Sequence, residues 1–431
     1  MSVSLLVLGV IVVLGAIAAT VVVFVLPGDK GNGSNGPHRV AGEQPSPPAN
    51  DASPQWDAPS HTWVALSEDW TVPQVDKSPH AYGLASDDQR VFTLRKPLGD
   101  LGESLRQEPE AELTAYDGAS GKRLWRKTLP WIQDASPVAG NGIVVVPSGK
   151  QEDGSVTGPQ AANYIAFDSA TGAERWRVKV SQRATFPTVT SRPGNAPGVF
   201  FKGVFYYGDG PKLVGVDPAT GRVRYQTAGK NHVIVAGPVV AGGRITVITE
   251  EPFNPSAPSY VRTAFMFTPD LKGQVSSDFP EHAKPEAITA SGDVLVAWGA
   301  NVIWATDARN GRGLWSKQLP DLTETTGVLG KVIIVHDFRD NAKKKFLGYD
   351  LLSGKQLWTT IPPNLSGSTT ESFNVGIADG TLFALAHGIT IINATNGEKV
   401  FTHSTNRGGG LVTTAAGRIV VYNQDGITGF K

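Results

Sequence analysis

Beyond its first sixty residues the chain alternates short apolar runs with glycine-containing turns, and long helical patterns are absent. One kind of apolar run ends at an Asp or Asn, which is followed four residues on by Gly and eight residues on by an aromatic residue. The Asp or Asn side chain can accept backbone N–H groups, and the Gly can adopt the positive φ that closes a turn. Each copy therefore predicts a β-hairpin whose second strand carries the aromatic residue.

The copies of this pattern are spaced like a repeat array. Successive Asp or Asn positions differ by 51, 49, 90, 43 and 43 residues, and since 90 is about twice 45, a degenerate copy is expected at Met266–Gly273. A period of forty to fifty residues predicts one architecture built from repeats. The six clear copies are Asp117, Gly121 and Trp125; Asp168, Gly172 and Trp176; Asp217, Gly221 and Tyr225; Asp307, Gly311 and Trp315; Asp350, Gly354 and Trp358; and Asn393, Gly397 and Phe401.

A second hairpin signal precedes most copies, as an alternating apolar run broken by a tight turn. Examples are Ala139–Ile143, Ala241–Arg244, Ser291–Val294, Ala378–Thr381 and Ala416–Ile419. Two hairpins per repeat give four antiparallel strands, and four-stranded units of this period are typical of the blades of a β-propeller. The sequence therefore predicts an all-β fold.

The two ends of the chain predict how the propeller closes. Ile427–Lys431 matches Leu113–Asp117, so the chain stops where the third strand of a blade ends. Leu66–Pro73, which contains Trp70, resembles an aromatic fourth strand but has no first three strands before it. If this N-terminal strand completes the last blade, the propeller has eight blades; seven is the alternative if Met266–Gly273 is only a long loop.

The repeat resembles the tryptophan-docking repeat of quinoprotein-like propellers, and Ala115–Trp125 carries the resemblance most fully. That superfamily includes the pyrroloquinoline-quinone alcohol dehydrogenases and a non-enzymatic outer-membrane assembly scaffold. The resemblance covers roughly residues 62–431 and implies that the aromatic residues wedge between neighbouring blades, where they bury apolar surface. The expected docking residues are Trp70, Trp125, Trp176, Tyr225, Trp315, Trp358 and Phe401.

Composition narrows the chemistry that is expected of this chain. Lys and Arg balance Asp and Glu at 39 each, which argues against a nucleic-acid partner. Cysteine is absent, so the adjacent-cysteine disulfide that the resemblance implies for quinoprotein enzymes cannot form. His336 and His387 follow apolar runs, but none of the eight histidines has metal-ligand spacing. No catalytic, cofactor or metal residue is assigned, and the repeated Asp residues are interpreted as turn residues.

The N-terminus carries a different signal. Leu5–Leu26 is an unbroken apolar run of 22 residues, long enough to cross the hydrocarbon core of a bilayer as a helix. We expect a transmembrane helix within residues 1–27, a disordered Gly/Pro/Ser-rich linker at 28–60 and the propeller at 61–431. A cleaved signal peptide is the alternative. Lys30 and Arg39 favour a cytoplasmic propeller by the positive-inside bias, but long domains translocate largely regardless of charge. The resemblance implies that the propeller faces outward, and we expect it on the extracytoplasmic side of the plasma membrane.

Specificity is expected in insertions, because repeat cores pack against one another while insertions form loops. The longest are Gly149–Ala162, Glu251–Tyr260 and Asp337–Lys345. Phe253 and Tyr260 are the candidate partner-binding residues, since exposed aromatic side chains anchor interfaces.

These features together predict a non-catalytic binding or assembly platform, held at the plasma membrane by a single span and facing other envelope proteins, a peptide or a small ligand. A quinone-dependent dehydrogenase and a ligand-sensing receptor domain are the alternatives.

Overall fold

The computed structural model describes most of the chain from residue 67 onward, with gaps between strands. The described residues are 67–73, 81–95, 110–130, 136–148, 163–180, 198–229, 232–251, 262–279, 285–299, 301–321, 323–337, 339, 345–361, 374–378, 381–385, 388–404, 411–423 and 426–431. No helix long and apolar enough to cross a membrane occurs among them. The predicted membrane segment and linker, residues 1–27 and 28–60, lie outside the described residues.

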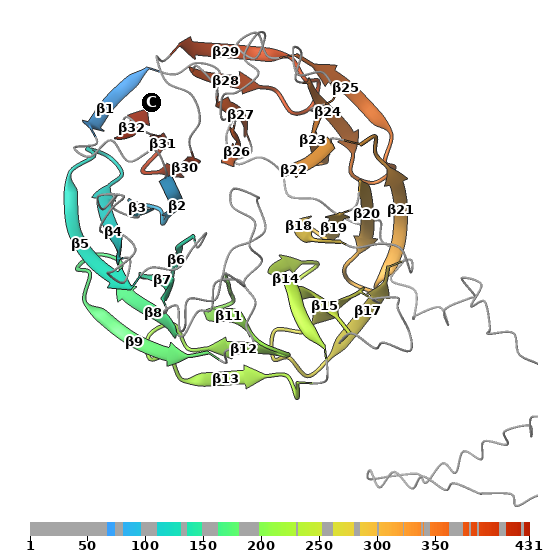
Figure 1. The fold of residues 1–431 in the computed structure, drawn as a ribbon, viewed down its shortest axis with the longest axis horizontal. Helices are drawn as coiled ribbons and strands as arrows, with labels where there is room; N and C mark the ends of the chain where they lie inside the picture. The colour runs from blue at the N-terminus through green and yellow to red at the C-terminus, as the bar shows by residue number, and fades with distance from the viewer. Residues whose placement is uncertain are drawn as a thin grey trace, which may run out of the picture. The chain divides into compact units, whose positions relative to one another are not determined.

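The described residues form eight four-stranded antiparallel sheets arranged as a ring (Figure 1). This confirms the prediction of an all-β propeller of four-stranded antiparallel blades. Blade 1 contains β2 (Ala81–Ser86), β3 (Arg90–Arg95), β4 (Glu110–Asp117) and β5 (Arg123–Pro130); blade 2 contains β6 (Val138–Gly140), β7 (Ile143–Ser148), β8 (Asn163–Asp168) and β9 (Glu174–Lys179). Blade 3 contains β10 (Val199–Phe201), β11 (Val204–Asp209), β12 (Lys212–Val216) and β13 (Val223–Gln226); blade 4 contains β14 (Val233–Ala241), β15 (Arg244–Glu250), β16 (Arg262–Phe267) and β17 (Gln274–Asp278).

The second half of the ring repeats the same order. Blade 5 contains β18 (Ala287–Ser291), β19 (Val294–Gly299), β20 (Val302–Asp307) and β21 (Arg312–Gln318); blade 6 contains β22 (Thr323–Leu329), β23 (Val332–Asp337), β24 (Lys345–Asp350) and β25 (Gln356–Thr360). Blade 7 contains β26 (Asn374–Ala378), β27 (Thr381–Leu385), β28 (Gly388–Ile392) and β29 (Lys399–Ser404). Blade 8 contains β30 (Leu411–Ala415), β31 (Arg418–Asn423), β32 (Gly426–Phe430) and β1 (Glu68–Pro73).

The two ends of the described chain close the ring by sharing blade 8. β1 pairs antiparallel with β32, and Trp70 lies opposite Gly429 in the register. Beyond the strands, Ser67 and Lys431 exchange two backbone hydrogen bonds of 3.0 Å. The closure is therefore held by a full strand ladder between segments at opposite ends of the sequence, in the way that the match of both termini to repeat strands predicts.

Burial follows the radial position of each strand. The second strands β7, β19 and β23 are buried along their whole length, because both of their faces contact a neighbouring blade. The outermost strand β5 is mostly exposed. Apolar clusters lie between successive blades, for example the one that contains Val145, Ile165 and Phe205 from blades 2 and 3. The hydrophobic core of the propeller is thus a series of interfaces between blades.

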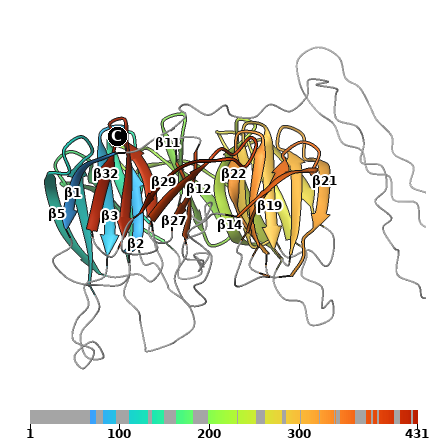
Figure 2. The same ribbon diagram turned by 90° about the horizontal axis from the view of Figure 1, so that it is seen from above.

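Antiparallel pairing sorts the connections between the two ends of the ring. In each blade, the turn between strands 1 and 2 and the turn between strands 3 and 4 lie at the same end of the ring, which we call the turn end. Figure 2 shows the ring from the side, with the strands extending between its two ends. Strands 2 and 3 are joined at the opposite end. The three insertions noted in the sequence each join a second strand to a third strand, so the strand ends that they connect share that opposite end. Phe253 and Tyr260 themselves lie outside the described residues.

Candidate functional site

The turn between strands 3 and 4 is built by the Asp and Gly of the repeat. In blade 2 the Asp168 carboxylate accepts hydrogen bonds from the backbone N–H groups of Ala170 and Thr171, at 3.1 and 2.8 Å, and from the Thr171 hydroxyl. Gly172 closes the turn at φ 70° and donates its N–H to the Asp168 carbonyl. The carboxylate satisfies local backbone groups, so it is a turn residue in the structure.

An arginine side chain stabilises the ionised form of the Asp168 carboxylate. The Arg175 side chain donates to Asp168, and this bond together with those from Thr171 lowers the pKa of Asp168 to about 2. Arg224 bonds to Asp217 in the same way one blade further on. These acids therefore stay ionised at neutral pH, with their oxygens occupied by the turn and an arginine.

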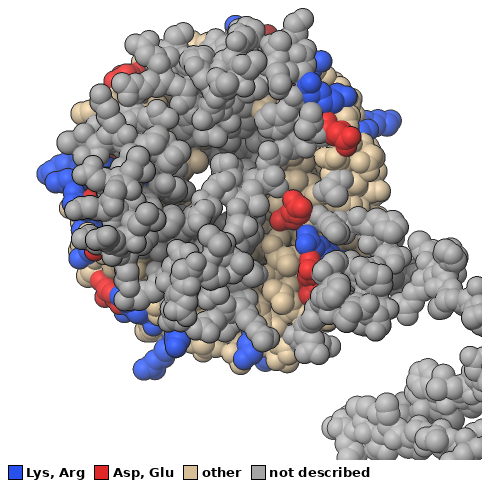
Figure 3. Space-filling view, viewed as in Figure 1, with Lys and Arg blue, Asp and Glu red and all other residues tan. Residues whose placement is uncertain are grey.

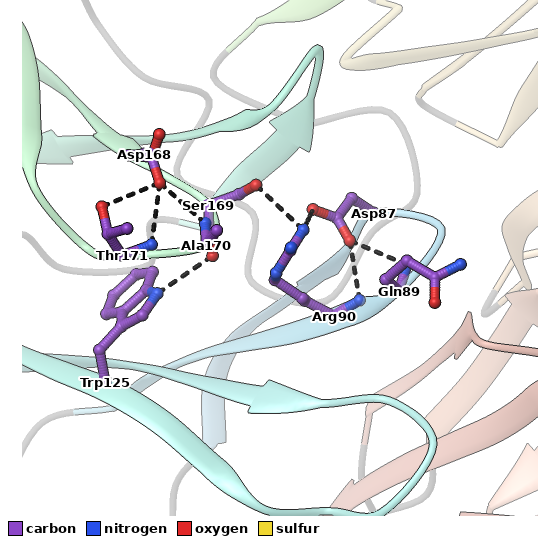
Figure 4. Close-up of polar contacts among 8 residues, drawn as sticks. All are labelled: Asp87, Gln89, Arg90, Trp125, Asp168, Ser169, Ala170 and Thr171. Carbon is purple, nitrogen blue, oxygen red and sulfur yellow. Dashed lines mark hydrogen bonds and ion pairs between the residues drawn. The ribbon is translucent and has the colours of Figure 1, made fainter.

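The Trp residues of the repeat dock on the next blade. Trp125 of blade 1 donates its indole N–H to the carbonyl of Ser169 in blade 2, at 3.0 Å (Figure 4). In each such contact the acceptor is the residue directly after the turn Asp or Asn. The other four bonds are Trp70 to Gly118 at 3.3 Å, Trp176 to Pro218 at 2.7 Å, Trp315 to Leu351 at 2.9 Å and Trp358 to Ala394 at 2.7 Å.

The peptide unit after the turn Asp is held from two sides. Ser169 donates its N–H to the carbonyl of Gly142, at the turn between β6 and β7 of its own blade, while its carbonyl accepts from Trp125 of the preceding blade. We call the turn between the first and second strands of a blade its inner turn. Gly118 and Leu351 donate their N–H groups to the inner turns of blades 1 and 6, at 2.7 Å each. These acceptors were not predicted, because the repeat pattern identifies the ring that docks but not the carbonyl that it meets.

Glycine and alanine make the room for the docked rings. A Cβ atom at Gly172 would lie 2.7 Å from Cδ2 of Trp125, closer than two carbon atoms can approach. The residue paired with Trp125 across the strands is Ala115, and the residue paired with Trp358 is Gly348. Both the turn Gly and this small partner are therefore part of the docking geometry.

Three of the eight junctions depart from this arrangement. At the junction of blades 3 and 4 the hydroxyl of Tyr206, on β11, donates to the Pro269 carbonyl, whereas the predicted docking residue Tyr225 packs against the same core. At the junction of blades 4 and 5, Ser276 occupies the position where other blades carry the docking aromatic residue, and it is paired with Phe265. The turn that precedes Ser276 starts at Thr268 instead of Asp, and Thr268 donates its N–H to Gly273 at 2.8 Å.

The third exception is the junction of blades 7 and 8. The residue at the docking position is Phe401, whose side chain has no N–H to donate. It is paired with Ile391, whereas the Trp and Tyr docking residues are paired with Gly or Ala. Phe401 packs against the apolar cluster that contains Ile389, Ile419 and Phe430. This junction is therefore held by apolar contact.

An additional polar network joins blades 1 and 2. Asp87 accepts the backbone N–H groups of Gln89 and Arg90 at 2.9 and 2.7 Å, and it pairs with the Arg90 guanidinium at 3.2 Å. The same Arg90 nitrogen lies 3.3 Å from the hydroxyl of Ser169, which is 2 % exposed (Figure 4). Blade 1 thus holds Ser169 twice, through the Trp125 indole at its carbonyl and through Arg90 at its hydroxyl.

Beside this network is an open hollow of about 760 Å³ at the turn end. Its walls are the tips of three hairpins, Ser86–Arg90 of blade 1, Ala139–Gly142 of blade 2 and Thr414–Gly417 of blade 8, and we call it the turn-tip hollow. Ala416 donates its N–H to the Asp88 carbonyl at 2.9 Å, which fixes two of the tips together. This hollow was not predicted, because its walls come from blades at the two ends of the described chain.

The remaining residues singled out in the sequence do not gather into a further site. His336 is 3 % exposed, and its ring lies 5.0 Å from that of Phe346, inside blade 6. Asp337 pairs with Arg339, whose hydrogen bond lowers the pKa of that carboxyl. His387 lies outside the described residues. Within the described ranges, no three His, Asp or Glu side chains come together in a way that could hold a metal ion.

Charge is spread around the ring. Figure 3 shows Lys and Arg side chains scattered along the rim of the described surface, with Asp and Glu between them. Some of these cations are already paired, such as Arg126 with Glu112 and Arg177 with Glu174, both at 3.0 Å. The described part of this view therefore shows no single basic stripe of the kind that nucleic acids require.

Comparison with known proteins places the repeats in a family. The family described as outer membrane protein assembly factor BamB matches residues 161–254 and 268–427, more than half of the chain. Among solved structures, BamB from Moraxella catarrhalis aligns over 85% of this chain and 97% of its own, with 13% identity and a TM-score of 0.51. Quinohemoprotein alcohol dehydrogenase from Comamonas testosteroni aligns over 85% of this chain and 76% of its own, with 12% identity and a TM-score of 0.55.

One curated relative is an enzyme. Tetrathionate hydrolase from Acidithiobacillus ferrooxidans is 25% identical over 139 residues, which are 31% of this chain. The match spans 25% of the length of that relative. The match to this enzyme therefore covers only a segment of a few repeats.

Proposed function

The chain belongs to the family of the outer membrane protein assembly factor BamB, and we propose that it is a non-catalytic propeller that binds other proteins as a platform in the bacterial cell envelope. The observation that carries this proposal is the family match, which covers repeats on both sides of the Thr268 turn. The description of the family names an assembly factor, which supports a role in binding other proteins.

The use of the aromatic residues supports a binding platform. The indole groups of Trp70, Trp125, Trp176, Trp315 and Trp358 are all committed to the next blade, so they stabilise the ring and are not available to cage a ligand. The turn-tip hollow is open and lined by polar turn residues. Small-molecule pockets are usually concave and mostly apolar, so an open polar hollow favours a protein surface as its occupant.

We further propose that residues 5–26 anchor the chain in the plasma membrane as a single span and that the propeller faces the extracytoplasmic side. The length of the apolar run supports the anchor, and the family description supports the side. Protease treatment of intact cells that carry a tag after Lys431 tests the orientation. Loss of the tag is expected, and protection until lysis would place the propeller in the cytoplasm.

The enzyme alternative rests on a shared fold. The Comamonas testosteroni dehydrogenase is 12% identical, and a likeness at that level shows the fold alone. The test is to incubate the purified full-length chain with pyrroloquinoline quinone, calcium and a panel of alcohols and sugars. No turnover above the buffer rate is expected, and turnover that is abolished by boiling would contradict the platform proposal.

The platform itself is tested by chemical crosslinking in living cells, followed by purification of the full-length chain and mass spectrometry. The control is an unrelated protein of equal abundance with the same N-terminal 60 residues. Envelope proteins enriched on the propeller and absent from the control are the expected result. Equal recovery from both would refute the proposal.

A further inference from the structure

The hairpin between β2 and β3 carries more charged residues than the other described inner turns of the ring. Two-residue turns between paired strand ends occur in Gly140–Ile143, Phe201–Val204, Ala241–Arg244, Ser291–Val294 and Leu329–Val332. In blade 1 the Asp87 N–H donates to the Arg90 carbonyl at 3.1 Å, so the turn residues are again two, Asp88 and Gln89. The sequence Asp-Asp-Gln-Arg therefore brings three charged side chains to the turn-tip hollow on a turn of ordinary length.

The charges of this tip are not all neutralised. Asp87 is occupied by Arg90 and by two backbone N–H groups, and Arg90 is shared between Asp87 and Ser169. Asp88 is exposed, and within the described residues its carboxylate has no hydrogen-bond or ionic partner; only its backbone carbonyl is used, by Ala416. Among the described residues that line the hollow, Asp87, Asp88 and Arg90 are the charged ones. The one uncompensated charge in the described lining of the hollow is therefore negative.

The neutral lining can complete a hydrogen-bonded site around that charge. Gln89 and Asn141 carry amide groups on two of the three tips, and Thr414 carries a hydroxyl on the third. The Ser86 hydroxyl is already paired with Thr413 at 2.6 Å. A guanidinium has five N–H donors and an ammonium has three, so a basic side chain can use a carboxylate and several neutral oxygens at once.

The size of the hollow defines the kind of molecule that carries this cation. About 760 Å³ is more than one side chain fills, and the site is open to solvent. We propose that the turn-tip hollow binds a protein segment that inserts an arginine or lysine side chain, with Asp88 as its counter-charge. This inference rests on the proposed function, because it names the chemistry by which the platform recognises a partner.

A titration with a minimal probe tests the charge requirement. The isotope-labelled full-length chain is titrated with N-acetyl-arginine amide, and the backbone amide signals of Gln89, Asn141 and Gly417 are followed by NMR. The neutral analogue N-acetyl-citrulline amide has nearly the same shape and is the matched ligand control. Saturable shifts at these amides with the arginine probe, and at least threefold weaker binding of the citrulline probe, are expected. Equal affinities for the two probes would overturn the proposal.

Variants locate the counter-charge. An exposed ion pair contributes modestly, so Asp88→Asn is expected to weaken arginine binding by about threefold to fivefold. Asp88→Lys should abolish saturation, because it places a like charge at the site. Glu110→Gln removes one negative charge from an exposed residue at the start of β4, at the opposite end of the ring, and should leave the affinity unchanged. Unchanged binding by Asp88→Asn, or an equal loss with Glu110→Gln, would overturn the assignment.

The test separates the two levels of the proposal. If arginine binding fails while crosslinked envelope partners are still recovered, the platform stands and the chemistry assigned to the hollow is wrong. If no partner is recovered but the arginine probe binds, the hollow is a cation site on a protein whose proposed function is wrong.

Discussion

Two glycines in blade 2 allow the energy of docking to be measured by a matched pair of substitutions. Gly142 and Gly172 have nearly the same backbone conformation, with φ angles of 76° and 70°. A Cβ atom at Gly142 meets nothing within 4 Å, whereas a Cβ atom at Gly172 would lie 2.7, 2.9 and 3.0 Å from three ring atoms of Trp125. Alanine at either site bears the same left-handed strain, and only Gly172→Ala also collides with the docked ring.

The expected magnitudes follow from these distances. Left-handed backbone costs an L-residue about 1–2 kcal/mol, so Gly142→Ala should destabilise the propeller by about that amount. Forcing a methyl group into a packed site costs about 1–3 kcal/mol more, which gives about 2–5 kcal/mol for Gly172→Ala. The ring cannot easily move away, because Cγ and Cδ2 of Trp125 lie at the base of the side chain and the indole N–H is bonded to Ser169.

Guanidinium chloride unfolding of both variants, followed by far-ultraviolet circular dichroism, measures the difference. The same two substitutions are then made in a Trp125→Ala background, as a double-mutant cycle. There the collision is gone, so Gly172→Ala and Gly142→Ala should cost the same. Equal costs in the wild-type background, or an excess that persists without Trp125, would refute the docking account.

Three further predictions concern the docking hydrogen bond of Trp358, the turn carboxylate of Asp168 and the closure of the ring by β1 and β32. Trp358→Phe removes the donor to the Ala394 carbonyl and should lower the free energy of unfolding by about 1–3 kcal/mol, measured by the same unfolding curves; no loss would contradict the role of the indole N–H. The pKa of Asp168 is lowered to about 2, mainly by Arg175, so its contribution to stability is complete above pH 3.8 and is lost as the pH falls toward 2. Asp168→Asn should therefore lower Tm at pH 7 and flatten the dependence of Tm on pH between 4 and 2, and an unchanged slope would exclude this carboxylate as a cause of acid destabilisation. Deletion of residues 426–431 removes the strand that pairs with β1 and should make the ring sensitive to limited proteolysis near blade 8, whereas an unchanged digestion pattern would contradict closure by shared strands.

Local chemistry explains why so much of the fold was readable in the sequence. An Asp, a Gly four residues later and an aromatic residue eight residues later define a turn and the following strand without reference to the rest of the chain. Trp125 and Trp358 lie at the junctions that this spacing indicates, and β1 joins β32 as the match of both termini predicts. The degenerate copy near Thr268 is also a turn, because a Thr hydroxyl replaces the carboxylate and accepts the N–H of Gly273 at 2.9 Å.

The parts that were not predicted depend on how neighbouring blades meet. Tyr225 stands at the docking position of blade 3, but the hydrogen bond to blade 4 comes from Tyr206 on another strand. Ser169 donates its N–H to the inner turn of its own blade and accepts a hydrogen bond from Trp125 of the preceding blade. Arg90 reaches its hydroxyl across 79 residues of sequence. No pattern within one repeat carries such information, and for the same reason the turn-tip hollow appears only in three dimensions.

Site-specific photocrosslinking in living cells tests whether the propeller binds other proteins through the turn-tip hollow. A photoreactive phenylalanine analogue is placed, one position at a time, at Gln89 and Asn141 in the turn-tip hollow and at the exposed positions Leu124 and Val223 on the outer strands. Discrete adducts with other proteins are expected at Gln89 and Asn141, and Asp88→Asn is expected to reduce them. The absence of protein adducts at every position, in cells where the full-length chain is folded and abundant, would contradict the claim that this propeller is a protein-binding platform.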